Sequence, residues 1–224
     1  MSVRRCAHMG WLWGAGLAVG MAVASLANQA SAEAGPDRPP EELTQHAFEL
    51  LQAGRLVESE QVFRQALAGD PNFVQARFGL GTVYYEAGRV GEAITMLEEV
   101  HEEFPDFYPV LNNLAWIYAT TEELHYRNGT RAIRLAQEAI FQQPQRFQVW
   151  NTLAEAYYVL GDYSRAERAS RQALRYARAQ GAPQEQQTRY EQSIRRARTA
   201  AQAEAILAAA PDRIERISSA LSNP

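Results

Sequence analysis

From Glu41 onward, apolar residues recur at intervals of three and four positions, and no segment alternates apolar and polar residues over a sustained stretch. Spacing of this kind is typical of one face of an α-helix, whereas strict alternation would indicate a half-buried strand. The helical segments come in pairs. Glycine-containing turns separate the two helices of a pair, and prolines close the first three pairs. The pattern therefore predicts an all-α protein built from helix-turn-helix units.

The pairs are copies of one repeat. Pro71, Pro105 and Pro144 recur in steps of 34 and then 39 along the chain. Three further sets of equivalent residues have the same spacing, and we call each set a column. The first is Tyr84, Tyr118 and Tyr157. The other two are Ser59, Ala93, Ala132 and Ala166, and Ala66, Val100, Ala139 and Ala173. The third unit carries the same five-residue insertion in every column. A period of this size predicts a stack of repeats, because one unit cannot bury its apolar face alone.

The columns divide the chain into four units between residues 41 and 181. Their expected limits are 40–73, 74–107, 108–146 and 147–181, with the insertion in residues 122–129 and a turn at Asn128-Gly129. Residues 182–224 are expected to form C-terminal capping helices. A polar helix is predicted over residues 184–209, and a short one follows Pro211-Asp212. A polar last helix is suited to covering the open end of a stack.

The repeat resembles the tetratricopeptide repeat. That family has the pattern Trp-x2-Leu-(Gly/Ala)-x2-Tyr, then a central Gly, then Ala, Phe, Ala and Pro. The fourth unit matches it in WNTLAEAYYVLGDYSRA, residues 150–166. The second and third units match in Leu80, Gly81, Tyr84, Gly88, Ala93 and Pro105, and in Leu114, Ala115, Tyr118, Ala132, Ala139 and Pro144. The resemblance covers about 140 residues and is weakest in the first unit.

The resemblance implies a right-handed superhelical stack with a concave groove lined by the first helices of the units. In such a stack small residues such as Gly81 let the two helices of a unit approach closely, and large residues fill the remaining space. The family's groove holds an extended or helical peptide of another protein. Some members clamp an acidic C-terminus with Lys and Arg, but the corresponding positions here hold no basic residue.

By resemblance, the groove-facing positions that we expect to contact a partner are Phe48, Phe78, Thr82, Tyr85, Asn112, Trp116, Asn151, Glu155 and Tyr158, with Thr44 beside them. Asn112 and Asn151 occupy equivalent positions of the third and fourth units. An asparagine amide both donates and accepts, so it can pair with a peptide backbone. Aromatic rings supply contact area at low entropic cost. The alternative is that several of these rings pack between neighbouring units.

Residues 1–32 have the layout of a secretory signal peptide. Arg4 and Arg5 precede an apolar run over residues 11–27, and Ala30-Ser31-Ala32 fits the small-x-small cleavage pattern. An uncleaved membrane anchor is the alternative, although an apolar run of this length barely spans a bilayer core. Residues 33–40 are expected to form an extended linker because Pro39-Pro40 bars a helix there. Export to a bacterial periplasm, with a mature chain beginning at Glu33, is the resulting expectation.

Composition narrows the possible functions. The only cysteine is Cys6, so the mature chain has no disulfide and no thiol nucleophile. Residues 33–161 hold 9 Arg and 19 acids, net −10, whereas residues 162–224 hold 11 Arg and 7 acids, net +4. An exported, acidic chain is a poor candidate for binding nucleic acid.

Chemistry-bearing residues form no recognisable catalytic constellation in the sequence. His46, His101 and His125 lie in different units without metal-ligand spacing, and there is no glycine-rich phosphate loop or nucleophile elbow. We therefore expect no enzymatic activity, no metal and no cofactor. Acidic clusters such as Glu98-Glu99 are expected to be solvated faces.

One charged pattern lies on the second helix of the fourth unit. Its five arginines follow steps of 3, 3, 4 and 3, which places them on one face of a helix. They are Arg165, Arg168, Arg171, Arg175 and Arg178, here named the arginine stripe. The stripe is either a solvated face or a docking site for an anionic partner. Ala166, Ala169, Ala173 and Ala177 lie on the opposite side and are expected to pack.

Taken together, the sequence predicts a non-enzymatic interaction scaffold or adaptor of the bacterial cell envelope, which binds a polypeptide in its groove. The alternative is a ligand-binding accessory protein of an envelope transporter or of a secretion or assembly system. A deep closed pocket would favour that alternative, and an open groove would favour the adaptor. The sequence names neither the partner nor the oligomeric state.

Overall fold

A computed structural model describes residues 38–208 of the 224-residue chain. In this part the chain forms nine helices, α2 to α10, and no strand. The prediction of an all-α fold with a C-terminal helix is therefore confirmed. The predicted signal peptide, most of the linker and the short helix after Pro211 lie outside the described residues.

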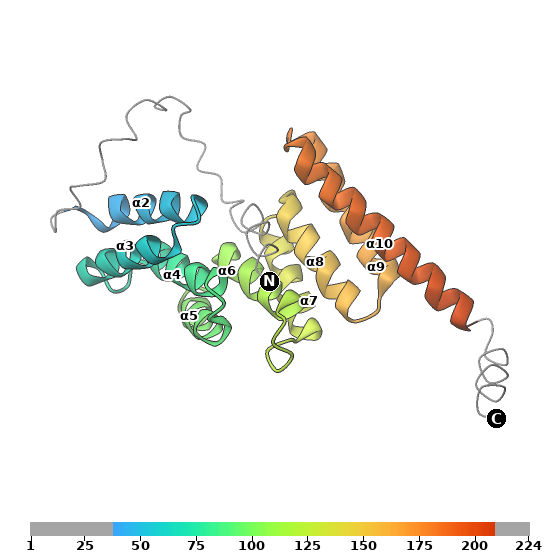
Figure 1. Cartoon of the computed structure of the whole chain (residues 1–224), viewed down its shortest axis with the longest axis horizontal. Coiled ribbons are helices and arrows are strands. Elements are labelled where there is room, and N and C mark those ends of the chain that lie inside the picture. Colours follow the sequence, from blue (N-terminus) through green and yellow to red (C-terminus); the bar gives the residue numbers. More distant parts are fainter. Residues whose placement is uncertain (1–37, 209–224) are drawn as a thin grey trace, which may run out of the picture. The chain divides into compact units, whose positions relative to one another are not determined.

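The N-terminal unit extends to Asn128. It contains α2 (Pro40–Gln52), α3 (Leu56–Gly69), α4 (Val74–Glu86), α5 (Val90–Glu103) and α6 (Tyr108–Thr120), coloured from blue to green in Figure 1. Within this unit helices adjacent in the sequence pack together, and α4 also contacts α2 and α6. The contacts between alternate helices are those expected when paired helices stack as repeats.

The C-terminal unit begins at Gly129. It contains α7 (Gly129–Gln142), α8 (Phe147–Val159), α9 (Tyr163–Ala179) and α10 (Gln184–Ala208), coloured from green through yellow to red in Figure 1. Here too, helices adjacent in the sequence pack together. The boundary between the two compact units falls inside the third predicted repeat, whose first helix is α6 and whose second is α7.

Four turns depend on a glycine with positive φ. Gly54, Gly88, Gly161 and Gly181 have φ values of 74°, 79°, 79° and 66°, a conformation that other residues rarely adopt. The third repeat differs. Its turn lies at residues 124–126 rather than at the predicted Asn128-Gly129, and Gly129 instead begins α7, where an added Cβ would lie 2.7 Å from Leu160.

Close helix contacts in the N-terminal unit occur at glycines. A Cβ on Gly79 would clash with the ring of Phe63, and one on Gly81 would lie 2.9 Å from Leu97. Both large side chains are fully buried, so neither has room to move aside. The close approach of α4 and α5 expected at Gly81 is therefore confirmed.

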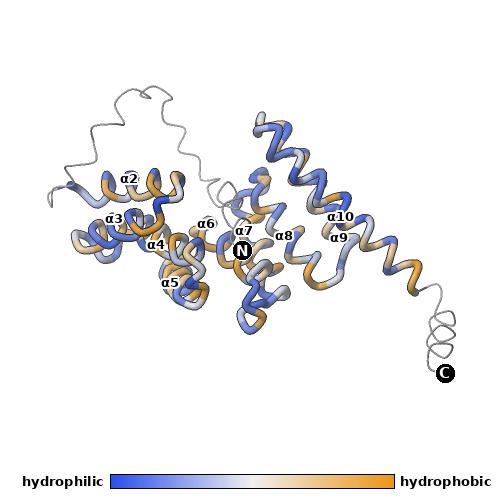
Figure 2. Tube along the Cα trace, viewed as in Figure 1, coloured by the Kyte–Doolittle hydropathy of each residue, from blue (hydrophilic) through white to orange (hydrophobic). Residues whose placement is uncertain are grey.

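Helix α9 of the C-terminal unit packs mainly through small side chains. The four alanines opposite the arginine stripe are buried on α9, as the spacing predicted. Helix α10 buries only Tyr190 and Ala197, and the Tyr190 ring lies 6.0 Å from that of Phe147 on α8. Figure 2 shows α10 as a largely hydrophilic helix, which agrees with the polar capping helix expected from the sequence. No helix within residues 38–208 is long and apolar enough to cross a membrane.

Candidate functional site

The six expected contact positions of the N-terminal unit are mostly buried. Exposed fractions are 9% for Phe48, 6% for Phe78, 1% for Thr82, 6% for Asn112 and 4% for Trp116. Tyr85 differs because it is partly exposed. Its hydroxyl lies 3.2 Å from the Thr120 hydroxyl at the end of α6. Tyr85 is therefore the most accessible of these six positions.

Ring packing accounts for the buried phenylalanines. Phe48 lies edge-on to Phe63 at 4.9 Å and 6.4 Å from Phe78, and Phe78 lies edge-on to Phe107 at 5.6 Å. These rings come from α2, α3, α4 and the residue that precedes α6. Edge-to-face pairs of this kind stabilise a fold beyond the area that they bury. Phe48 and Phe78 thus join successive repeats, as the packing alternative in the sequence analysis anticipated.

Hydrogen bonds hold Thr82 in the interior of the N-terminal unit. Its hydroxyl donates to the carbonyl oxygen of Phe78 at 2.9 Å and accepts from the side-chain amide of Asn113 at 3.1 Å. Asn113 follows the expected contact residue Asn112 and was not singled out by sequence reasoning. The sequence gives no signal of this pairing, because Asn113 belongs to the next repeat and no motif links it to Thr82.

In the C-terminal unit the structure brings Glu155 and Tyr158 together with Arg196. The Arg196 guanidinium donates to Glu155 Oε2 at 2.6 Å and lies 4.0 Å from the centre of the Tyr158 ring. Tyr158 also contacts Tyr163 edge-on at 5.2 Å. Helix α10 therefore supplies a cation to two expected contact positions of α8. Sequence reasoning missed Arg196 because it lies far along the chain from Glu155 and outside the repeat pattern.

Asn151 on α8 is fully buried, and neither atom of its side-chain amide has a hydrogen-bond partner among the described residues. A buried amide without partners costs roughly 1–3 kcal/mol. Of the nine expected contact positions, six lie in the N-terminal unit and three in the C-terminal unit. As partner contacts they all remain predictions.

The arginine stripe is exposed along α9, as its spacing predicted. Three of its members pair with carboxylates: Arg165 with Asp162 at 3.2 Å, Arg171 with Glu167 at 2.6 Å and Arg178 with Glu191 at 2.7 Å. Among the described residues, Arg168 and Arg175 have no carboxylate within 4 Å. The stripe is thus neutralised in part, and these two arginines keep its unbalanced charge.

One largely buried carboxyl stands out in the N-terminal unit. Burial raises the pKa of Glu86, the last residue of α4, to about 7, and its Oε1 has no hydrogen-bond partner among the described residues. A glutamate at a helix end looks like a surface residue in the sequence, so nothing signalled its burial. Within residues 38–208 no three His, Cys, Asp or Glu side chains are grouped to hold a metal.

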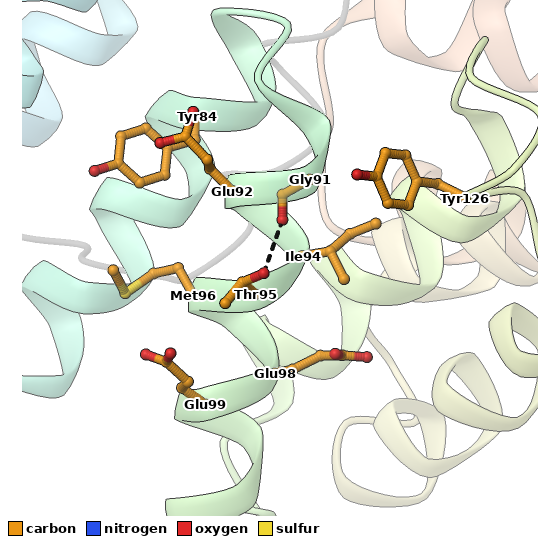
Figure 3. Close-up of a pocket in the computed structure, with 9 residues that line it drawn as sticks. All are labelled: Tyr84, Gly91, Glu92, Ile94, Thr95, Met96, Glu98, Glu99 and Tyr126. Atoms are coloured by element: carbon orange, nitrogen blue, oxygen red, sulfur yellow. Dashed lines mark hydrogen bonds between the residues drawn. The ribbon is translucent and has the colours of Figure 1, made fainter.

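A hollow of about 590 Å³ lies beside α5 in the N-terminal unit, and it opens broadly to solvent. Figure 3 shows the residues that line it. Tyr84 of α4 stands at one side and Tyr126 of the inserted loop at the other. We name it the acidic hollow. Its lining residues are Tyr84, Gly91, Glu92, Ile94, Thr95, Met96, Glu98, Glu99 and Tyr126. An open hollow of this form does not enclose a small molecule.

Comparison with known proteins identifies the repeat. Two family models, both described as tetratricopeptide repeat, match residues 50–117 and 127–183. Superkiller protein 3 of Saccharomyces cerevisiae is 34% identical over 56 residues, which are 25% of this chain and 4% of that protein. The chain thus spans a small fraction of that relative.

Solved structures share the fold. A thermophilic tetratricopeptide repeat protein of Thermus thermophilus matches with a TM-score of 0.60 and 20% identity, over 81% of this chain and 98% of that one. MamA from Desulfovibrio magneticus, residue 41 to its end, matches with a TM-score of 0.58 and 12% identity, over 81% and 96%. At such identities the likeness concerns the fold alone. The two matched segments nevertheless cover more than half of the chain, and the chain belongs to the tetratricopeptide repeat family.

Proposed function

We propose that this protein is a non-enzymatic adaptor of the bacterial cell envelope that binds a segment of a partner polypeptide on the first helices of its repeats. Tetratricopeptide repeat proteins generally mediate protein–protein interaction. The envelope location rests on the signal-peptide pattern of residues 1–32, with cleavage after Ala32.

The observation that carries the proposal is a pair of equivalent tyrosines. Tyr85 on α4 and Tyr158 on α8 each directly follow a tyrosine of the repeat column, in the second and fourth repeats. Both remain partly exposed, although most of the neighbouring contact positions are buried. A partly exposed tyrosine combines apolar contact area with a hydroxyl for hydrogen bonding, which is why tyrosine is frequent in interfaces. Each unit thus presents one such ring to a partner segment.

The polar groups beside each tyrosine suit a peptide. The Thr120 hydroxyl lies next to Tyr85, and the Glu155–Arg196 pair lies next to Tyr158. Hydroxyl and carboxylate oxygens accept from peptide N–H groups, and a guanidinium donates to peptide carbonyls. Each unit therefore offers one aromatic contact with polar groups at its edge.

Site-specific photo-crosslinking tests the function. A photoreactive phenylalanine analogue replaces Tyr85 or Tyr158 in the full chain produced in its host, with Phe141 as the control position. Phe141 is 90% exposed on the second helix α7, so it reports contacts made by exposure alone. We expect one shared polypeptide crosslinked at both tyrosine positions and absent at Phe141, recovered with a chain that begins at Glu33.

The matched substitutions are Tyr85→Ala and Tyr85→Phe. Loss of the ring should weaken partner binding about 5- to 30-fold, corresponding to roughly 1–2 kcal/mol, whereas Phe should retain most of it. Asn151→Ala removes an unpaired amide, so the variant should stay folded and report any role of that amide in binding. Identical crosslinks at all three positions, or an intact Met1 terminus in the membrane fraction, would contradict the proposal.

A further inference from the structure

The acidic hollow is built by the five-residue insertion of the third repeat. Tyr126 of the inserted segment packs against α5 at Gly91, where an added Cβ would clash with the tyrosine hydroxyl. Only a glycine at that position lets the ring approach so closely. The loop is held by Arg127, whose guanidinium donates to the carbonyl oxygen of Thr121. One wall of the hollow therefore exists because the insertion folds back on the preceding repeat.

The lining of the hollow is anionic. It includes Glu92, Glu98 and Glu99, and none of its lining residues is basic. Glu92 pairs with Arg89 and Glu99 lies 3.8 Å from Arg77, while Glu98 accepts from the Tyr118 hydroxyl. Glu92 and Glu99 are more than half exposed, and a carboxylate has about four acceptor sites. Both carboxylates can therefore accept further donors from outside the unit.

Their spacing is regular. Glu92 and Glu99 are seven residues apart on α5, which is two helical turns or about 10.5 Å along one face. Thr95 and Met96 lie between them in the sequence and also line the hollow (Figure 3). A helix laid along this face meets two carboxylates with the side chain of Met96 between them. Such a surface fits a helix that presents two cations with the same spacing.

Helix α9 of the same chain presents two cations with this spacing. Arg168 and Arg175, the two members of the arginine stripe without a carboxylate partner among the described residues, are also seven residues apart. They are exposed on α9, and the buried alanines of that helix face the other way. The charges of the two parts of the chain are complementary as well, at −10 for residues 33–161 and +4 for residues 162–224.

We propose that the arginine stripe of a second copy of this chain docks in the acidic hollow. In that contact Arg168 and Arg175 reach the two carboxylates that flank the hollow. The two surfaces differ, so the contact is heterologous and association continues beyond a dimer unless it closes into a ring. This self-association goes beyond the proposed adaptor function and does not depend on it, because neither surface includes Tyr85 or Tyr158.

Sedimentation velocity of the purified full chain tests the inference. We expect concentration-dependent association at about 50 mM NaCl that weakens about 10-fold or more at about 500 mM, because exposed charges are screened by salt. R168E/R175E should abolish it at low salt. R134E/R195E is the matched control, since it makes the same change in charge at two other exposed arginines that have no carboxylate within 4 Å among the described residues.

A charge swap separates this contact from a general effect of charge. E92R/E99R should not associate alone, and neither should R168E/R175E. A chain that carries all four substitutions should associate again, because the pairs are restored in reversed polarity while the net charge is unchanged. Circular dichroism checks that each variant is folded. A chain that is monomeric at every concentration, or R168E/R175E that associates like the control, would overturn the inference. So would a monomeric chain that binds an arginine-rich peptide, since the occupant of the hollow would then be a basic segment of another protein.

Discussion

Helix α6 of the N-terminal unit buries eleven of its 13 residues, whereas α10 of the C-terminal unit buries two of 25. In the N-terminal unit, large side chains such as Phe63 and Leu97 fit against glycines of α4. In the C-terminal unit, α9 packs mainly through alanines, and α10 is held by two buried residues, Tyr190 and Ala197, and by several arginine contacts. Buried apolar area stabilises far more than exposed ion pairs do. A helix inside the repeats is therefore held by buried area, whereas the helix that follows the last repeat depends more on contacts at its surface.

The largest expected effect breaks the core of the N-terminal unit. Phe63→Ala removes a fully buried ring that fills the space beside Gly79 and contacts Phe48. It should lower the free energy of unfolding by about 3–5 kcal/mol, measured by denaturant unfolding. Phe141→Ala makes the same change at a residue that is 90% exposed and should stay within about 0.5 kcal/mol of the parent. Equal shifts for the two variants would argue against a packed core at Phe63.

A smaller effect concerns the buried carboxyl of the N-terminal unit. Burial raises the pKa of Glu86 to about 7, so the folded state holds its proton more tightly than the unfolded chain does. Its contribution to stability is fully present below the ordinary pKa of a glutamate and is lost as pH rises through about 7. Glu86→Gln should therefore stabilise the protein by roughly 1–3 kcal/mol near pH 8.5 and have little effect near pH 4.

Thermal unfolding across this pH range measures the difference. Glu138→Gln is the control, because Glu138 is exposed on α7 of the C-terminal unit. The control should follow the parent at both ends of the range. If Glu86→Gln also followed the parent at both, the side chain would be solvated when ionised.

The smallest effect tests the attachment of α10. Arg196→Ala removes the pair with Glu155 and the contact with the Tyr158 ring, both partly exposed to solvent, so we expect a loss of about 1 kcal/mol. Hydrogen exchange should show faster exchange along α10 and no change in the N-terminal unit. Arg195→Ala, at the neighbouring position, should leave exchange unaltered. Uniform acceleration throughout the chain would mean that α10 is part of a single cooperative core.

The helix pairs and their repeat could be predicted because the recurring prolines, tyrosines and alanines occupy positions where a helix or a turn needs that type of residue. Gly54 and Gly88 end helices because they adopt positive φ, and that property belongs to the residue itself. The turn of the third repeat could not be predicted in this way. In the structure, Tyr126 of that turn packs on Gly91 of α5. These two residues are far apart in the sequence, and no local pattern indicates their contact.

The site was harder to predict for the same reason. Phe48 and Phe78 have the spacing expected of groove positions, yet their rings pack against other rings. An apolar side chain at a given repeat position fits either role, and only the neighbouring side chains decide between them. The contact of Arg196 with Glu155 and Tyr158 likewise depends on where α10 packs. The repeat pattern does not predict this, because α10 follows the last repeat.

The main packing contacts join helices one or two places apart along the chain. Formation of each helix pair therefore closes only a short stretch of chain, and low contact order of this kind is associated with folding on the microsecond to millisecond scale. The earliest pairs have their packing partners as soon as about two repeats of the chain are available. The contact between Arg196 and Glu155 joins α10, the last described helix, to α8. It therefore forms only after α10 has been synthesised, which makes it one of the last contacts to form.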